Sequence, residues 1–105
     1  MKEEIIDGIY YRLDKGNLTA EVIEQRKGIL NDYKGDIIIP ETVVFNTATY
    51  RVTSIGYAAF CGCKSLTDIT FQGTIAQWNK IKLRENWKDK VPATVVHCTD
   101  GDVEI

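Results

Sequence analysis

Three short strand-like segments recur along this chain, and their spacing is the feature that most limits how it can fold. The segments are Asp36-Ile37-Ile38-Ile39, Asp68-Ile69-Thr70-Phe71 and Thr94-Val95-Val96-His97. Ile37 lies 32 residues before Ile69, and Ile69 lies 27 residues before Val96. Periods of this length are typical of proteins in which each repeat is one supersecondary unit that buries its apolar face against the next. The spacing therefore predicts parallel strands that stack in sequence order.

The second of these segments shows which side chains the stack would bury. Leu66, Ile69 and Phe71 are its apolar positions, and Thr67, Asp68 and Thr70 stand between or beside them. We expect the apolar three to point inward and the polar three to point outward or to an edge. Across the whole chain we expect five large side chains to be mostly buried: Tyr11, Phe60, Leu66, Phe71 and Trp78.

Hairpin patterns precede the repeats. Residues 9–14 and 18–23 alternate apolar and polar side chains around Lys15-Gly16-Asn17, which predicts a hairpin over residues 7–24 with one wet face. The polar stretch 25–35 is expected to be a loop. A second hairpin is expected to join Val43-Val44-Phe45 to Tyr50-Arg51-Val52.

The C-terminal third mixes helix and strand signals. Thr74 is a candidate N-cap for a short helix through Ile81, and a charged stretch with Trp87 inside it follows. A strand is expected over residues 91–98, a turn over 99–102 and a short tail over 103–105. Asp100-Gly101-Asp102 lacks the full loop of oxygen ligands that calcium needs, so we interpret it as a turn.

Composition excludes several classes of function. The 105 residues hold 13 Lys and Arg against 15 Asp and Glu, a net charge of −2, which argues against a nucleic-acid surface. No apolar run in the sequence approaches the roughly 20 residues of a membrane span. The start, Met1 to Ile6, is acidic and short and has no visible signal peptide. We therefore expect one globular domain without membrane insertion.

Cysteine and histidine could supply a metal site or a nucleophile, and both readings are weak. The available set is Cys61, Cys63, His97 and Cys98. His97 and Cys98 are neighbours on an expected strand and would point to opposite faces, so they would not reach one zinc ion together. We expect Cys63 and Cys98 to be small buried hydrophobes and His97 to face solvent. No activated-nucleophile loop surrounds these residues, so we predict no catalytic site, no metal and no cofactor.

Several small motifs occur in one order and carry a resemblance to a known family. They are Ile37-x-Ile39-Pro40, Val52-Thr53-Ser54-Ile55-Gly56, Ala59-Phe60, Gly62-Cys63, Ser65-Leu66-Thr67 and Ile69-x-Phe71. In this arrangement the chain resembles the BspA-like leucine-rich repeat proteins, found at the surface of anaerobic bacteria and some protists. The stretch from Gly73 to Gly101 resembles the unit that closes such arrays. The N-terminal hairpin with Gly35-Asp36 and Tyr50-x-Val52-Thr53 resembles the unit that opens them.

The resemblance implies a fold and a division of the chain. The fold would be mainly β with short helices, a short leucine-rich-repeat-type solenoid of stacked parallel strands. It would form a single domain, residues 1–105, with an N-terminal β-hairpin cap over 1–35, a repeat region over 36–72 and a helix-containing C-terminal cap over 73–105. One complete repeat, about Val52 to Phe71, lies between the two ends.

The resemblance also implies a function, a non-enzymatic protein-binding or adhesion module of a secreted or cell-surface protein. The absence of a visible signal peptide leaves a cytoplasmic location open. Candidate contact residues, chosen from strand alternation, are Arg51, Tyr57, Lys64, Thr67, Asp68 and Thr70. The alternative is a structural unit that assembles with itself through exposed strand edges and has no ligand of its own. The sequence does not set the oligomeric state.

Overall fold

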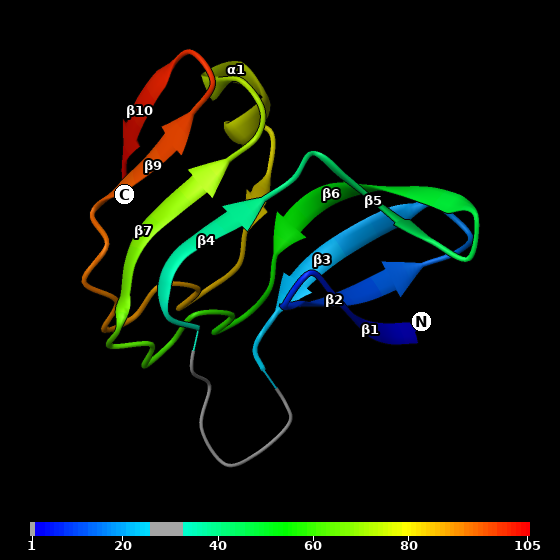
Figure 1. Ribbon diagram of the computed structural model, residues 1–105, viewed down its shortest axis with the longest axis horizontal. Coiled ribbons are helices and arrows are strands. Elements are labelled where there is room, and N and C mark those ends of the chain that lie inside the picture. Colours follow the sequence, from blue (N-terminus) through cyan, green and yellow to red (C-terminus); the bar gives the residue numbers. More distant parts are fainter. Residues whose placement is uncertain (1, 26–32) are drawn as a thin grey trace.

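The computed structural model describes residues 2–25 and 33–105, and these form two β-sheets and one short helix (Figure 1). Residues 26–32 of the expected 25–35 loop lie outside the described residues, as does Met1. The elements are β1 Lys2–Ile6, β2 Ile9–Asp14, β3 Thr19–Ile23, β4 Gly35–Ile39, β5 Thr42–Phe45, β6 Ala48–Ile55, β7 Leu66–Phe71, α1 Ile75–Trp78, β8 Lys82–Leu83, β9 Val95–Cys98 and β10 Gly101–Glu104. The expected mainly β fold is confirmed.

The first sheet is built around the N-terminal hairpins. Its strands lie in the order β1-β2-β3-β6-β5, and β8 also pairs with β6. The predicted hairpin is β2–β3, and a strand that the sequence patterns did not predict, β1, pairs antiparallel with β2. The second predicted hairpin is β5–β6. β3 and β6 pair in parallel, which joins the two hairpins into one sheet.

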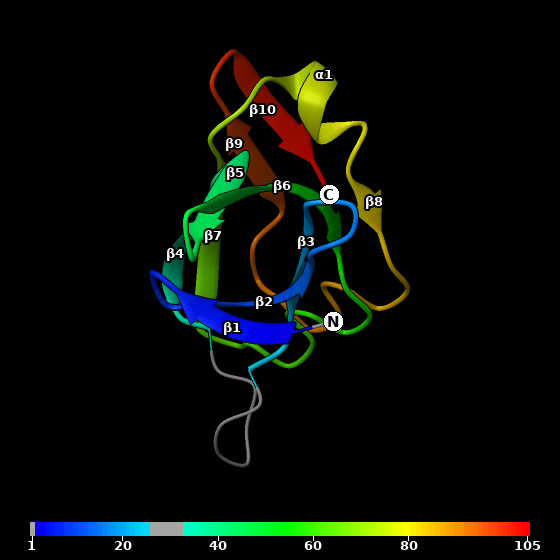
Figure 2. The ribbon, with the colours of Figure 1, turned by 90° about the vertical axis from the view of Figure 1, so that its right-hand side faces the viewer.

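The second sheet contains the three recurring segments. Its order is β10-β9-β7-β4, and β4, β7 and β9 run parallel. Ile37 lies opposite Ile69, and Ile69 lies opposite Val96, so the three residues aligned by the repeat spacing share one row. All three are buried. Figure 2 shows the first sheet facing the viewer, with β4, β7 and β9 behind it.

A bulge explains why two adjacent residues of β7 are both exposed. Gly35 pairs with Leu66 but Asp36 pairs with Asp68, so Thr67 is an extra residue in β7. Thr67 and Asp68 are therefore both exposed, whereas Leu66 and Ile69 on either side are buried. The Thr67 hydroxyl lies 3.3 Å from the Gly35 carbonyl oxygen. A bulge of this kind re-aims side chains at the start of a strand.

The core between the sheets holds a chain of aromatic rings. All five side chains expected to be buried are at most 2% exposed. The Phe60 ring packs edge-on against Tyr33 and Trp87, with centroids 5.3 and 6.1 Å apart. Trp87 continues to Trp78 at 6.0 Å, and Trp78 to Phe71 at 5.6 Å. These contacts link the turn after β6 to α1 and β7, and each adds to the burial of apolar area.

The helix is shorter than predicted. It ends at Trp78 rather than reaching Ile81, and β8 begins at Lys82. Thr74 is its N-cap, as expected, and forms a capping box in which its hydroxyl accepts from the Gln77 N–H. The Gln77 side chain in turn accepts from the Thr74 N–H. Beyond Trp78 the chain continues in turns, and the Ile81 N–H donates to the Trp78 carbonyl.

Three C-terminal expectations were wrong in detail. Gly101 to Glu104 form a strand, β10, antiparallel to β9, instead of part of a turn and a tail. The strand predicted over 91–98 begins at Val95. Cys63 is fully buried as expected, but Cys98 is half-buried because it lies near the sheet surface at the end of β9.

Candidate functional site

The outer face of the second sheet carries four carboxylates and one imidazole. Asp36 pairs with Asp68 across β4 and β7, and Thr70, His97 and Asp102 form a neighbouring row across β7, β9 and β10. These residues point away from the core because Ile37, Ile69 and Val96 between them point into it. Together with Glu104 at the end of β10 they make up a surface called here the acidic face: Asp36, Asp68, Thr70, His97, Asp102 and Glu104.

Side-chain contacts tie the strands of this face together. The Thr70 hydroxyl donates to Asp36 Oδ1 at 3.2 Å, which joins β7 to β4. His97 Nδ1 lies 2.9 Å from Asp102 Oδ1, and His97 Nε2 lies 3.5 Å from Asp68 Oδ1. The imidazole therefore bridges β7 and β10. Its two nitrogens both donate only when the ring is protonated.

The charge of this face stays negative whatever the state of His97. The hydrogen bond to Asp102 raises the pKa of His97, and the Asp68 carboxylate adds to that rise. A protonated imidazole offsets one of the four carboxylates, so the face keeps a net negative charge. A surface of this sign attracts cationic partners and repels anionic ones.

Two of the six predicted contact residues, Asp68 and Thr70, belong to this face, and Thr67 lies beside them at the bulge of β7. Thr67, Asp68 and Thr70 stand together on β7. Arg51 is exposed on β6 of the other sheet, and Tyr57 and Lys64 are exposed in the turns between β6 and β7. The structure thus brings the three β7 residues together and leaves the other three apart from them.

Sequence reasoning did not select four residues of the face as contact residues, namely Asp36, His97, Asp102 and Glu104, and their sequence signals differ. Asp36 and Asp68 open two of the recurring segments, so the repeat register itself places them side by side. His97 was expected to face solvent, which is correct, but its carboxylate neighbours were not foreseen. Asp102 and Glu104 could not be placed without recognising β10.

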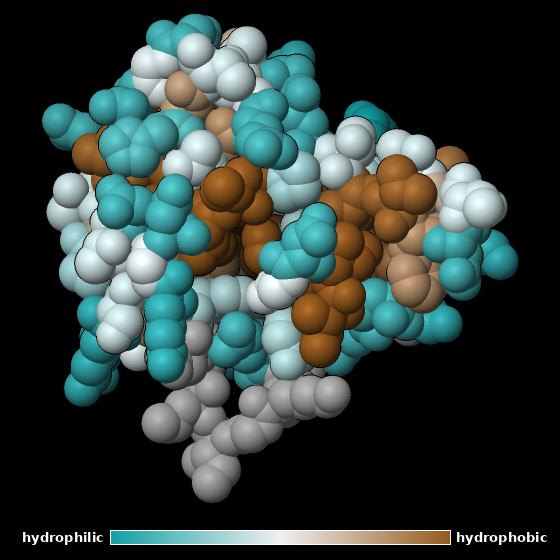
Figure 3. Space-filling model, viewed as in Figure 1, coloured by the Kyte–Doolittle hydropathy of each residue, from teal (hydrophilic) through white to brown (hydrophobic). Residues whose placement is uncertain are grey.

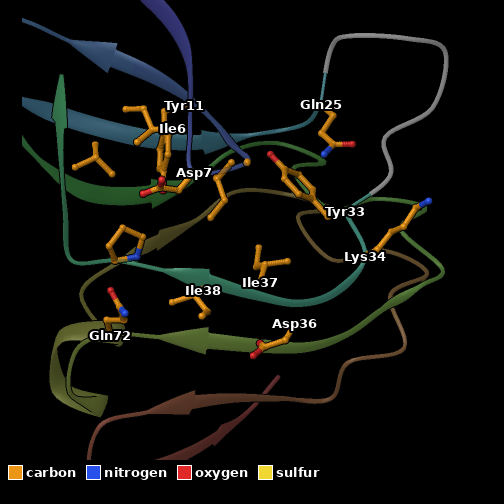
Figure 4. Close-up of a pocket in the computed structure, with 14 residues that line it drawn as sticks. Ile6, Asp7, Tyr11, Gln25, Tyr33, Lys34, Asp36, Ile37, Ile38 and Gln72 are labelled. Carbon is orange, nitrogen blue, oxygen red and sulfur yellow. The ribbon is translucent and has the colours of Figure 1, made fainter. Parts of the chain in front are cut away.

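A groove lies between the two sheets, next to β4. Its cavity volume is about 590 Å³. Figure 4 shows Ile6, Asp7 and Tyr11 on one side of it and Ile37 and Ile38 on the other. Apolar surface gathers over β4 and over the region of β1, β2 and β5 in Figure 3, with polar groups between them. A concave apolar site with a few polar groups is the usual form of a binding site.

Tyr33 fixes one end of this groove. Its hydroxyl donates to the Ile23 carbonyl at 2.7 Å and accepts from the Tyr10 N–H at 3.0 Å. Burial raises the pKa of Tyr33, so the phenol remains a neutral donor at ordinary pH. The first sheet is thereby tied to the chain that enters β4.

Metal-ligating side chains do not cluster in the described part of the chain. No group of three or more His, Cys, Asp or Glu residues there is arranged to hold an ion. Cys61, Cys63 and Cys98 form no disulfide. No helix within residues 2–25 and 33–105 has the length and apolar character needed to cross a membrane.

Two solved structures of leucine-rich repeat proteins are similar to this chain. No family model and no curated protein matches the sequence. A leucine-rich repeat protein from Bacteroides ovatus has a similar solved structure, with a TM-score of 0.65 and 29% identity over 89% of this chain. A leucine rich cell surface protein from Faecalibacterium prausnitzii also has a TM-score of 0.65, with 18% identity over 95% of this chain. The chain spans 22% and 24% of the length of these two proteins.

Proposed function

We propose that this chain is a non-enzymatic protein-binding module and that the acidic face is the surface that meets its partner. The observation that carries the proposal is that Asp36 lies opposite Asp68, with the His97–Asp102 pair in the neighbouring row, on a sheet whose other face is buried. Such a face needs no rearrangement to bind, which keeps the ordering cost of association low.

The proposal includes a solenoid architecture. The parallel stack β4–β7–β9 would be its rungs, the β1–β3 meander its N-terminal cap, and α1 with β10 its C-terminal cap. The proposal also includes the division of the chain into an N-terminal cap that ends at residue 35, a repeat region that ends at residue 72 and a C-terminal cap. Repeat proteins of this type commonly present a strand surface to their partners. The likeness to leucine-rich repeat proteins supports this reading.

A secreted or cell-surface location belongs to the same proposal. It is supported by the Faecalibacterium prausnitzii structure, which is described as a cell surface protein. The partner would then be an extracellular protein with a basic surface.

Charge disfavours the alternative of head-to-tail self-assembly. The ends of the second sheet are β4 and β10, and joining them between copies would bring Asp36 close to Asp102 and Glu104. Like charges on adjacent strands destabilise the pairing. Sedimentation equilibrium at increasing protein concentration tests this point, and we expect the monomer mass throughout.

The proposed function is tested by capture and affinity measurement. The immobilised chain is exposed to separate extracellular proteins, and each bound protein is measured again with Asp68→Asn/Asp102→Asn. The matched control is Glu85→Gln/Asp89→Asn, which removes two exposed carboxylates elsewhere. We expect the face variant to weaken binding at least about ten-fold and the control to leave it unchanged. Equal binding by all three chains would exclude the acidic face.

A further inference from the structure

β4 ends the second sheet on the side of the groove. Among the described strands, β7 pairs with β4, and none pairs with its other edge. Gly35 N–H donates to the Ser65 carbonyl at 2.7 Å, and the Ile39 carbonyl accepts from Gln72 N–H at 2.9 Å. Alternate residues of a strand direct their backbone groups to opposite sides, so those of Asp36 and Ile38 face the groove. This edge therefore presents two N–H and two carbonyl groups in the arrangement that an added strand needs.

Apolar side chains line the groove next to this edge of β4. Ile38 is 48% exposed because it alternates with the buried Ile37 and Ile39 and lies on the outer face opposite Thr70, and it also lines the groove. The opposite wall includes Ile6, Tyr11 and Val43. An extended segment beside β4 would place alternate side chains against this wall and the others beside Ile38 on the outer face. In this mode of binding the backbone hydrogen bonds to the edge give affinity, and burial of the alternate side chains gives specificity.

The acidic side chains near the groove determine which peptide segment can bind beside β4. Asp7 and Asp36 both line the groove, and Asp68 lies next to Asp36 on the outer face. Lys34 is the basic residue of the lining. Outward side chains of an added strand would lie beside the Asp36 carboxylate, so cationic residues there are favoured and acidic ones are repelled.

From these observations we infer that the edge of β4 takes up an extended peptide segment of a partner protein, in which apolar residues alternate with basic ones. The segment adds as a further strand to the second sheet, with its apolar side chains in the groove and its basic side chains beside Asp36. This inference rests on the proposed protein-binding function and adds a contact separate from the row of Thr70, His97 and Asp102.

A synthetic peptide tests the inference directly. The probe is a seven-residue peptide of alternating lysine and valine, acetylated and amidated so that it carries no end charges. One comparison peptide replaces lysine by glutamate. A second is the lysine–valine peptide with N-methyl groups on alternate backbone nitrogens, which removes the donors that pair with a strand edge. Affinity is measured by calorimetry, and the contact is mapped by amide chemical shifts in ¹H–¹⁵N spectra.

Matched protein variants separate edge pairing from charge attraction. Ile38→Pro removes an N–H that faces the groove and leaves the β4–β7 hydrogen bonds in place. Val44→Pro is its control, an exposed position in β5 at the edge of the other sheet. Near-ultraviolet circular dichroism and a thermal melt establish that both variants fold. If Ile38→Pro does not fold, the N-methylated peptide makes the same test on the wild-type chain.

We expect the lysine–valine peptide to bind and to shift the amides of Asp36 and Ile38. N-methylation and Ile38→Pro are each expected to weaken it at least about ten-fold, and the glutamate peptide to bind more weakly still. Val44→Pro should bind as the wild type does. Shifts confined to Asp68, His97 and Asp102, or equal binding of the N-methylated peptide, would overturn the inference and leave the acidic face as the binding surface. Absence of binding, or a dimer formed through β4 without peptide, would also overturn it.

Discussion

The Nδ1 of His97 lies 2.9 Å from Asp102 Oδ1, directly across the antiparallel pair β9–β10. The contact raises the pKa of His97 above its ordinary value of 6.5, so the folded state holds the proton more tightly than the unfolded state does. The stabilisation is fully present below the unfolded pKa and is lost as pH rises through the folded pKa. The link between the last two strands is therefore stronger in mildly acidic solution.

The first prediction concerns this pH dependence. Asp102→Asn should lower the pKa of His97, as measured by following the imidazole proton signals during an NMR titration. The loss of unfolding free energy relative to the wild type should be larger at about pH 5.5 than at about pH 8.5. Asp100→Asn is a control, because the Asp100 carboxylate instead accepts from the Ile75 N–H at 2.8 Å. An unchanged titration in Asp102→Asn would contradict the assignment.

Phe60 is the residue on which the core is expected to depend most. Its side chain is fully buried between the rings of Tyr33 and Trp87. Phe60→Ala should reduce the unfolding free energy by about 3–5 kcal/mol, because it removes apolar burial and leaves a cavity. Urea denaturation measures the loss. Tyr57→Ala, at a side chain that is 65% exposed, should change stability by less than about 0.5 kcal/mol.

Gly56 is required for close approach of two backbone segments. A Cβ atom there would lie 2.9 Å from the Val22 carbonyl oxygen, which accepts a hydrogen bond from the Gly56 N–H at 2.7 Å. Gly56→Ala should therefore destabilise the fold by about 1–3 kcal/mol through overpacking. At Gly16 the nearest atom would be 3.4 Å away, so Gly16→Ala is the matched control and should keep wild-type stability within about 1 kcal/mol in thermal denaturation.

Glu21 holds a polar network across the first sheet. Its Oε2 accepts from the buried Ser54 hydroxyl at 2.8 Å and from Arg84 Nε at 3.3 Å. Glu21→Gln removes the charge that strengthens both bonds, so we expect a loss of about 1 kcal/mol in chemical denaturation. The exposed Glu85→Gln should lose less than half of that. Equal effects of the two substitutions would show that the network adds no stability.

The alignment of strands in the second sheet could be predicted because the three recurring segments are visible in the local sequence. Ile37, Ile69 and Val96 each belong to one of the three recurring segments, and the repeat spacing aligns them in the row that the structure shows. The aromatic core was predictable for the same reason, since large apolar side chains next to strand signals are rarely left in water.

Other features depend on pairings that the patterns do not contain. β1 carries mostly charged, exposed residues, so its alternation is weak, although Asp7-Gly8 is a strong hairpin turn and both residues have positive φ. β10 is similarly polar. The groove forms because β3 pairs in parallel with β6 and positions the first sheet beside β4, a long-range contact without a local signal.

The central claim is that a protein partner binds the acidic face, and a footprint of the bound complex tests it most directly. Amide chemical shifts of the ¹⁵N-labelled chain should be recorded with and without a captured extracellular protein. We predict that the largest changes fall at Asp36, Asp68, His97 and Asp102, and that added salt reduces them. Changes centred instead on the strands of the first sheet, away from β4, would contradict the account.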